Sequence, residues 1–119
     1  MQRVLVVDDQ VDFRQAFCAL LEAQPDLEVV AQAGSLAEAR PMLEGVDVAL
    51  LDRGLPDGDG LKLMRPLREA NPRTRVLVMS ATAEMRHPTE AMRAGADGVI
   101  DKLGPFEQAF ALIRGEGGG

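Results

Sequence analysis

One stretch constrains this chain more than any other: an apolar run, Val48–Leu51, ends at a carboxylate, Asp52, and is followed by a glycine-rich segment, residues 53–60. A short continuous apolar run bounded by turn residues is typical of a strand that is buried on both faces. The glycines after it predict a loop that bends sharply and brings its backbone close to a neighbour. We therefore expect Asp52 at the carboxyl end of a central parallel strand, where open α/β sheets bind ligands. The alternative is that Asp52 only caps the strand and faces solvent.

Strands and helices are predicted to alternate along the chain. The other apolar runs that predict strands are residues 3–7, 27–33, 76–79 and 98–100. Apolar residues at helical spacing predict helices over residues 12–21, from residue 35, over residues 59–70 and 88–94, and from residue 105. Strands that alternate with helices predict an α/β fold with a single, doubly wound, five-stranded parallel sheet and helices on both faces.

Serine, proline and glycine residues refine the helix boundaries. Ser35 and Glu38 form a capping-box pattern, which predicts a helix start at Ser35. Pro41 falls inside that helix and is expected to kink or shorten it, and Pro66 interrupts the next predicted helix in the same way. Gly95 is well placed to cap the end of the helix before it.

Composition limits the classes of function. The chain has 119 residues, and we expect one domain over residues 1–114 with a flexible, Gly-rich tail or linker over residues 115–119. The formal net charge of −6 argues against binding of nucleic acid or an anionic membrane by this domain itself. No apolar run approaches the length that spans a membrane. A lone cysteine, Cys18, lies on an apolar helical stripe, which predicts a buried thiol and fits a reducing cytoplasm.

Polar residues follow the ends of four predicted strands. Right-handed crossovers place the carboxyl ends of parallel strands at one edge of the sheet, which gathers Asp8, Asp9, Asp52, Ser80 and Lys102. Two like unit charges about 4 Å apart repel by roughly 4 kcal/mol in a partly buried site, so three carboxylates need compensation. Lys102 supplies only one positive charge, and a divalent cation is expected to supply the rest. Mg²⁺ prefers oxygen ligands, and the sequence offers no histidine or cysteine cluster for zinc.

This set of groups suits phosphoryl transfer. Mg²⁺ and Lys102 would neutralise phosphoryl oxygens, and the Ser80 hydroxyl would donate to another oxygen. Asp52 would act as the nucleophile and form an acyl phosphate. The alternative is that the acids and Lys102 form an ordinary structural cluster of ion pairs.

The motifs of this edge resemble those of receiver domains of two-component response regulators, over residues 1 to about 114. They are Val6-Val7-Asp8-Asp9, Leu50-Leu51-Asp52 with Leu55-Pro56 and Asp59-Gly60-Leu61, Met79-Ser80-Ala81, Ala94-Gly95-Ala96 and Lys102. The resemblance implies a flavodoxin-like sheet with the strand order 2-1-3-4-5. It also implies that the protein is not an enzyme, beyond promoting its own phosphorylation and dephosphorylation.

The resemblance further implies a role for each residue of the edge. Asp52 is the expected phosphoacceptor, which takes its phosphoryl group from a histidine of a partner histidine kinase or phosphotransfer protein. Asp9 and Asp52 are expected to hold Mg²⁺ directly, with Asp8 acting through a water molecule and the backbone carbonyl of Gly54 as a further ligand. The residues expected to contact the phosphoryl group are Ser80 and Lys102.

Residues 23–30 are similar to the receivers that precede a LuxR-type helix-turn-helix. The switch is therefore expected to control an output, such as transcription, through a domain absent from this chain. A cytoplasmic location and a homodimer that forms on activation fit this class. Whether the chain is a fragment or a single-domain regulator stays open.

Two positions depart from the receiver pattern. Val99 stands where the family usually has Tyr or Phe, and Leu103 stands where a proline usually follows the lysine. In the family pattern, that aromatic residue fills the space left when the residue at position 80 moves towards the phosphoryl group. Val99 is too short to fill this space. We therefore expect the phosphorylation signal to be carried by the loop at residues 81–84 more than by position 99. A receiver-like interaction module that is never phosphorylated is the alternative function.

Two other classes of protein match the residues less well. A phosphatase of the haloacid dehalogenase type needs a second aspartate where this chain has Gly54. A flavodoxin-like electron carrier needs a hydroxyl-rich phosphate loop and aromatic rings, and aromatic residues make up only 3% of this chain.

Overall fold

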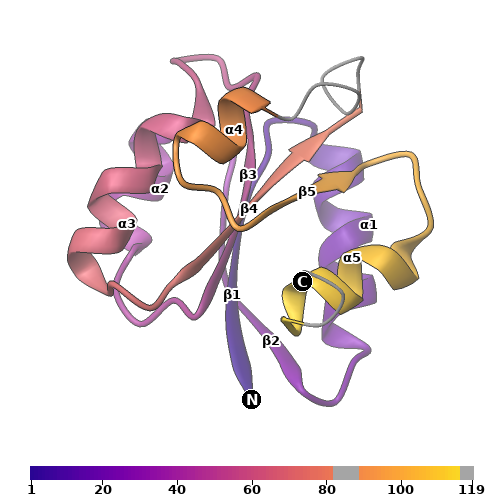
Figure 1. The fold of residues 1–119 in the computed structure, drawn as a ribbon. Coiled ribbons are helices and arrows are strands. Elements are labelled where there is room, and N and C mark those ends of the chain that lie inside the picture. The colour runs from indigo at the N-terminus through magenta and orange to yellow at the C-terminus, as the bar shows by residue number, and fades with distance from the viewer. Residues whose placement is uncertain (82–88, 116–119) are drawn as a thin grey trace.

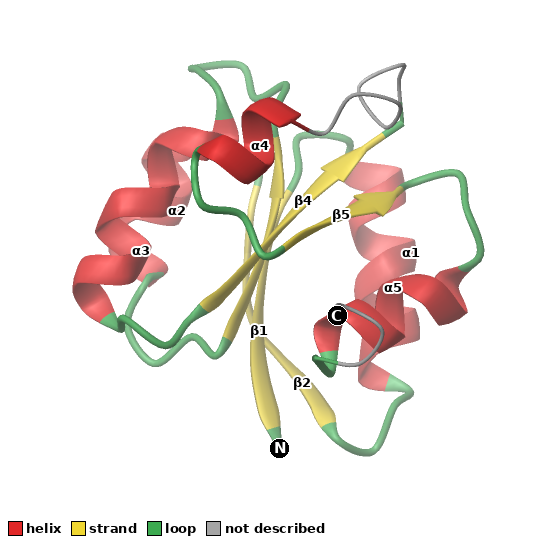
Figure 2. Ribbon diagram, viewed as in Figure 1, coloured by secondary structure: helices red, strands yellow, loops and turns green. Residues whose placement is uncertain are grey.

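The computed structural model describes residues 1–81 and 89–115. Within these ranges the strands form one parallel sheet in the order β2-β1-β3-β4-β5 (Figures 1 and 2). The strands are β1 (Gln2–Val7), β2 (Leu27–Ala33), β3 (Val48–Asp52), β4 (Arg75–Ser80) and β5 (Gly98–Asp101). The expected fold and strand order are confirmed.

Helices cover both faces of the sheet. The α-helices of the described residues are α1 (Val11–Glu22), α2 (Leu36–Ala39), α3 (Met64–Ala70), α4 (Thr89–Arg93) and α5 (Phe106–Ile113). Two short 3₁₀ helices, η1 (Arg40–Met42) and η2 (Gly60–Leu63), precede β3 and α3. Figure 1 shows α1 and α5 on one face of the sheet, with α2, α3 and α4 on the other.

Alternate residues of each strand pack into the two helical layers, because side chains along a strand point to opposite faces. In β1, Val4 and Val6 belong to the apolar cluster that contains Phe17 of α1. Leu5, which lies between them, belongs to the cluster that contains Leu67 of α3. The core is therefore split by the sheet into two apolar layers, and each strand contributes to both.

The start of α2 follows the predicted capping pattern, with one difference. The Ser35 hydroxyl accepts a hydrogen bond from the Glu38 amide, as expected for a helix cap. The Glu38 carboxylate reaches one residue further than in a capping box and accepts from the Gly34 amide at 2.6 Å. After Ala39 the helix tightens into η1, whose second residue is Pro41, so this proline shortens the helix as predicted.

The two other local signals also have a structural explanation. Pro66 is the third residue of α3, because the preceding turn is 3₁₀ and the α-helix begins only at Met64. A proline in the first turn costs no α-helical hydrogen bond, so it interrupts nothing there. Gly95 has a φ of 104°, its amide donates to the Met92 carbonyl at 3.0 Å, and the next amide donates to the Ala91 carbonyl at 3.1 Å. This is the predicted glycine cap at the end of α4.

The loop after β3 is anchored at two points. A side chain at Gly60 would collide with the backbone of Asp52, which explains the close backbone approach that the glycines predicted. Asp57 reaches across to α2, where its two carboxylate oxygens accept from the amides of Leu36 at 2.8 Å and Ala37 at 3.0 Å. The loop that follows Asp52 is therefore tied both to β3 and to the start of a neighbouring helix.

The remaining expectations concern the cysteine, membrane-spanning segments and three stretches that the structure does not describe. Cys18 is buried, as predicted. None of the helices in the described ranges is both long enough and apolar enough to cross a bilayer. The expected start of a helix at Pro88, the loop at residues 82–84 and residues 116–119 of the expected tail lie outside the described residues.

Candidate functional site

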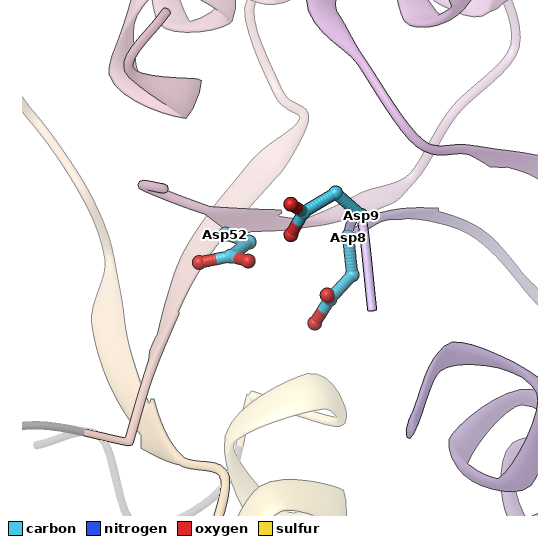
Figure 3. A group of neighbouring side chains, drawn as sticks. All are labelled: Asp8, Asp9 and Asp52. Atoms are coloured by element: carbon cyan, nitrogen blue, oxygen red, sulfur yellow. The ribbon is translucent and has the colours of Figure 1, made fainter. Parts of the chain in front are cut away.

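Three carboxylates meet at the carboxyl edge of the sheet, as Figure 3 shows. One oxygen each of Asp8, Asp9 and Asp52 lies within 4.8 Å of the other two. Asp8 is fully buried, Asp52 is half-buried and Asp9 is exposed. The cluster therefore has one side enclosed by protein and one side open to incoming groups.

The register of the sheet explains why the acids meet. Val7 of β1 pairs with Leu51 of β3, so the residues that follow them, Asp8 and Asp52, leave neighbouring strands at the same level. Val48 and Leu50 pack into the layer of α1 and α5, and Asp52 has their parity along β3. Asp8 likewise follows Val4 and Val6 of β1 at intervals of two residues, and these valines pack into the same layer. Both carboxylates therefore point towards the layer of α1 and α5.

Lys102 lies beside the two inner carboxylates. Its ammonium is 2.7 Å from Asp8 Oδ2 and 3.7 Å from Asp52 Oδ2, and its side chain is only 6% exposed. It also donates to Gln10 Oε1 at 2.7 Å and lies 4.5 Å from the centre of the Phe13 ring. The Lys102 amide donates to the Ser80 carbonyl at 3.0 Å, which fixes the backbone of the β5–α5 connection next to β4. The predicted counter-charge is therefore in place.

The buried Asp8 carboxylate has unused acceptor capacity. Asp8 Oδ1 accepts from the Gln10 amide at 2.8 Å. Oδ2 is buried and accepts no well-angled hydrogen bond from the described residues, although Lys102 Nζ approaches it to 2.7 Å. This short contact is an ion pair, and a carboxylate oxygen has further lone pairs that can accept. Three carboxylates beside a single ammonium leave a net negative charge, and an all-oxygen cluster of this kind fits a hard divalent cation.

A cleft of about 410 Å³ opens above the acids. The residues that line it are Asp9, Gln10, Asp52, Arg53, Gly54, Asp59, Met79, Ser80, Ala81 and Lys102. Every predicted site residue except Asp8 lines this cleft, and Asp8 lies directly beneath through its ion pair with Lys102. The structure thus brings together all six residues that the sequence singled out.

The environment of Asp52 disfavours its charged form. Burial raises the pKa of the Asp52 carboxyl above its ordinary value, and the nearby charges of Asp8 and Asp9 raise it further. The Gly54 amide, which donates to Asp52 Oδ1 at 3.1 Å, and the Lys102 ammonium lower the pKa in opposition. The net effect is a raised pKa for Asp52, so a cation bound beside these acids would lower the electrostatic cost of ionising this carboxyl.

Sequence reasoning missed the arginine next to Asp52. Arg53 Nη2 lies 2.7 Å from Asp59 Oδ2 and 2.9 Å from Glu90 Oε1 of α4. Although burial opposes it, the Arg53 pair and the Leu61 amide lower the pKa of the Asp59 carboxyl, and Asp59 and Glu90 raise the pKa of Arg53. One rim of the cleft is therefore an ion-pair chain that reaches α4. In the sequence, the one hint of this ion pair is that Arg53 and Asp59 carry opposite charges six positions apart.

Four further expectations have different outcomes. The carbonyl of Gly54 as a metal ligand stays a prediction, although this residue does line the cleft. Leu103 follows Lys102 with its side chain 80% exposed at the rim of the edge. Val99 is partly buried and packs against the α2 and α3 layer. The loop expected to carry the phosphorylation signal falls outside the described residues beyond Ala81.

Comparison with known proteins gives the family directly. The model of the response regulator receiver domain matches residues 4–114. Among curated proteins, the chain is 39% identical over 104 residues to the DNA-binding transcriptional activator DevR/DosR of Mycobacterium tuberculosis. The match covers 86% of this chain and 48% of that protein, so the chain spans about half the length of this relative.

Solved structures agree with this assignment. A LuxR-family two-component response regulator from Aurantimonas sp. SI85-9A1 aligns with a TM-score of 0.81 and 28% identity, over 96% of this chain and 86% of that chain. A Burkholderia pseudomallei response regulator with a phosphorylated aspartic acid and a calcium ion aligns with a TM-score of 0.80 and 26% identity, over 95% and 66% of the two chains. CheY6, in complex with the P1 domain of CheA3 from R. sphaeroides, gives a TM-score of 0.82 and 29% identity over 96% and 95%.

The matched family is a class of signalling modules, and its model covers every residue of the acidic cleft. The similar proteins include LuxR-family regulators, as the segment after α1 indicated. With its fold, its cleft and these relatives in agreement, the chain belongs to the receiver domains of two-component response regulators.

Proposed function

We propose that this chain accepts a phosphoryl group on Asp52 and thereby switches an output. The observation that carries the proposal is the juxtaposition of three carboxylates, one oxygen of each within 4.8 Å of the others, with a buried lysine beside them. A structural cluster of ion pairs would need about as many cations as anions. The described residues place one cation, Lys102, in direct contact with the inner pair.

Mg²⁺ is the proposed cofactor, and Asp9 and Asp52 would hold it directly. Asp8 would help through a water molecule, and the Gly54 carbonyl would complete the protein ligands. When bound, the cation supplies positive charge that neutralises phosphoryl oxygens and the repulsion among the acids. The all-oxygen donor set of the three carboxylates supports this choice over zinc.

The proposed reaction is a transfer from phosphohistidine to aspartate. An Asp52 carboxylate oxygen attacks phosphorus, the new O–P bond forms, and the N–P bond breaks with its electron pair left on the imidazole nitrogen of the donor. Lys102, which lies 3.7 Å from Asp52 Oδ2, would contact a phosphoryl oxygen, and Ser80, which lines the same cleft at the end of β4, would donate to another. The product is an acyl phosphate on Asp52, which water later hydrolyses to the free carboxylate and inorganic phosphate.

The proposed partner is a histidine kinase or a phosphotransfer protein. The similarity to a receiver solved in complex with a P1 domain supports this. The proposed output is transcription through a domain outside this chain, supported by the similarity to a DNA-binding activator of about twice the matched length. A homodimer on activation and a cytoplasmic location belong to the same proposal.

Acetyl phosphate labelling tests the central step. Wild-type protein incubated with acetyl phosphate and Mg²⁺ should gain one phosphoryl group, detected by intact mass, and the label should disappear with hydroxylamine. Asp52→Asn should remove the label, and Asp9→Asn should weaken Mg²⁺ binding. Asp57→Asn, outside the cleft but on the same loop, is the matched control and should keep the label.

Two outcomes would count against the proposal. A label that persists in Asp52→Asn would move the phosphoacceptor elsewhere. An unlabelled wild-type protein that is folded and binds Mg²⁺ would instead favour an interaction module that keeps the acidic site without being phosphorylated.

A further inference from the structure

An arginine from α1 holds the backbone beside the acidic cluster. Arg14 Nη1 donates to the Asp8 carbonyl oxygen at 2.6 Å. The Nε donor of the same guanidinium is buried and has no acceptor among the described residues. A buried donor left without an acceptor costs free energy, so the bond to the Asp8 carbonyl is the favourable contact that this guanidinium makes.

The bond replaces one that the sheet cannot make. The Asp8 amide donates to the Ala33 carbonyl at 2.9 Å, which is where the β1–β2 ladder ends. The donor that would continue this parallel ladder is the Ser35 amide, and Ser35 lies beyond the end of β2 as the N-cap residue of α2. The Asp8 carbonyl therefore reaches the end of β1 with β2 already finished, and the guanidinium of Arg14 supplies the donor.

The chain leaves space for this guanidinium at Gly34. A Cβ atom at Gly34 would lie 3.0 Å from Arg14 Nη1, 3.2 Å from Glu38 Oε1 and 3.9 Å from the Asp8 carbonyl oxygen. The first two distances are tighter than ordinary contacts. Gly34 has no positive φ that would require glycine for backbone reasons, so the fit against Arg14 and Glu38 is what favours it.

The carbonyl of Asp8 and the amide of Asp9 belong to one planar peptide group. A bond that fixes this carbonyl also fixes the direction in which the Asp9 side chain leaves the backbone. The Asp8 carboxylate has its own supports in Gln10 and Lys102. The exposed Asp9 carboxylate has no hydrogen bond or ion pair to any part of the chain that the structure describes, so its position depends on the backbone.

We propose that Arg14 is a positioning residue of the acidic site, which holds the Asp8–Asp9 peptide so that the Asp9 carboxylate is preorganised to bind a divalent cation. This inference rests on the proposed function, because it assigns a purpose to the cation ligands. Groups that orient metal ligands from behind typically change metal affinity by about 10-fold or more when removed.

Charge and geometry predict opposite results here, which makes the proposal testable. Arg14 is positive and lies close to the acids, so by electrostatics alone its removal should tighten the binding of Mg²⁺. By positioning, its removal should weaken binding. Calorimetric titration with Mg²⁺ suits this chain, which lacks tryptophan and tyrosine as fluorescent probes.

The variants are Arg14→Met, which keeps the apolar stem, and Arg14→Lys, which keeps one donor. Arg68→Met is the matched control, because Arg68 also donates to a backbone carbonyl, that of Gly95, at 3.0 Å and also has a buried Nε without an acceptor among the described residues. Arg68 makes this contact at the opposite edge of the sheet, next to the start of β5. Arg14→Met should raise the Mg²⁺ Kd about tenfold, Arg14→Lys should recover part of the loss, and Arg68→Met should leave the Kd unchanged.

A second readout needs no metal. Amide hydrogen exchange at Asp9 and Gln10 in the metal-free protein should become faster in Arg14→Met and stay unchanged in Arg68→Met. Gly34→Ala should produce a smaller change of the same sign with the arginine still present, and it carries both measurements if Arg14→Met does not fold.

Unchanged or tighter Mg²⁺ binding in folded Arg14→Met, or unchanged exchange at Asp9, overturns the inference. If wild-type protein binds no Mg²⁺ at all, the proposed function has failed. The inference about Arg14 is then decided by hydrogen exchange, where faster exchange at Asp9 supports the backbone clamp and unchanged exchange rejects it.

Discussion

The ammonium of Lys102 lies 2.7 Å from Asp8 Oδ2, and the two side chains are only 6% and 0% exposed. A buried pair of opposite charges gains little over an apolar pair, but removing one partner leaves the other charge uncompensated. The stability and the chemistry of this receiver domain are therefore coupled at one contact.

Lys102→Met should lower the free energy of unfolding by about 3 kcal/mol, because Asp8 is left buried beside two other acids without its cation. Urea unfolding followed by far-ultraviolet circular dichroism measures this. Lys62→Met, at the only other lysine and on the exposed surface, should change stability by less than about 0.5 kcal/mol. Adding Asp8→Asn to Lys102→Met should restore part of the loss, and strictly additive losses would show that the two charges are not coupled.

Asp52→Asn should stabilise the metal-free protein at neutral pH. Burial first, and the charges of Asp8 and Asp9 second, raise the pKa of the Asp52 carboxyl in the folded state. Above about pH 4 the unfolded chain loses this proton before the folded protein does. The free energy of unfolding therefore falls as pH rises from about 4 towards the folded pKa. The advantage of the variant should be absent near pH 3 and larger at pH 7. An advantage that is the same at both pH values would contradict this origin.

Cys18 should be unreactive in the folded state and should make stability fall in alkali. Burial, with a smaller contribution from Glu22, raises the pKa of the Cys18 thiol to about 11. The native state keeps this proton while the unfolded chain loses it near pH 9, so the free energy of unfolding falls between about pH 9 and 11, by roughly 2 to 3 kcal/mol. Comparison of unfolding curves with Cys18→Ala isolates the effect. Equal slopes against pH in the two proteins would refute it.

Asp57 should stabilise the start of α2 most strongly while it is ionised. The amides of Leu36 and Ala37 lower the pKa of the Asp57 carboxyl. Its contribution to stability is therefore fully present above the unfolded pKa of about 4 and is lost as pH falls through the lower folded value. Asp57→Ala should remove it at neutral pH and shift the Leu36 and Ala37 amide resonances, whereas Asp57→Asn keeps one acceptor and should retain part of it. Unmoved Leu36 and Ala37 resonances in Asp57→Ala would show that the clamp does not form.

The strands and their polar ends could be predicted because two simple signals coincide there. A parallel strand that is buried on both faces needs a continuous apolar run, and the four consecutive aliphatic residues Val48–Leu51 provide one. The chain must then leave the core, and the first residue to do so is Asp52. The same reasoning located Asp8 and Ser80, and the right-handed crossover rule placed them at one edge without knowledge of any contact.

The supports of the site could not be predicted in the same way. Gln10 and Lys102 are 92 positions apart, and nothing in the residues around Gln10 indicates an acceptor for a lysine. Arg14 and Arg53 are solvent-compatible residues with no periodic pattern, and their partners are set by the tertiary fold. The prolines had clear local meaning, but the place of Pro66 depended on a 3₁₀ turn that delayed the start of α3 by one turn.

The alternation of β1 and β3 side chains between the two layers has a consequence for how this chain can vary. Asp52 points to the same face as Val48 and Leu50 because it lies an even number of residues after each of them. The site therefore depends on the number of residues in the strand as well as on their types. Deleting one residue within Val48–Leu51 would preserve the composition of the strand and still send Asp52 into the opposite layer, away from Asp8. Insertions are therefore tolerable in the turns at the amino edge of the sheet and excluded from the last residues of β1 and β3, where a change of one position reverses which way the acid points.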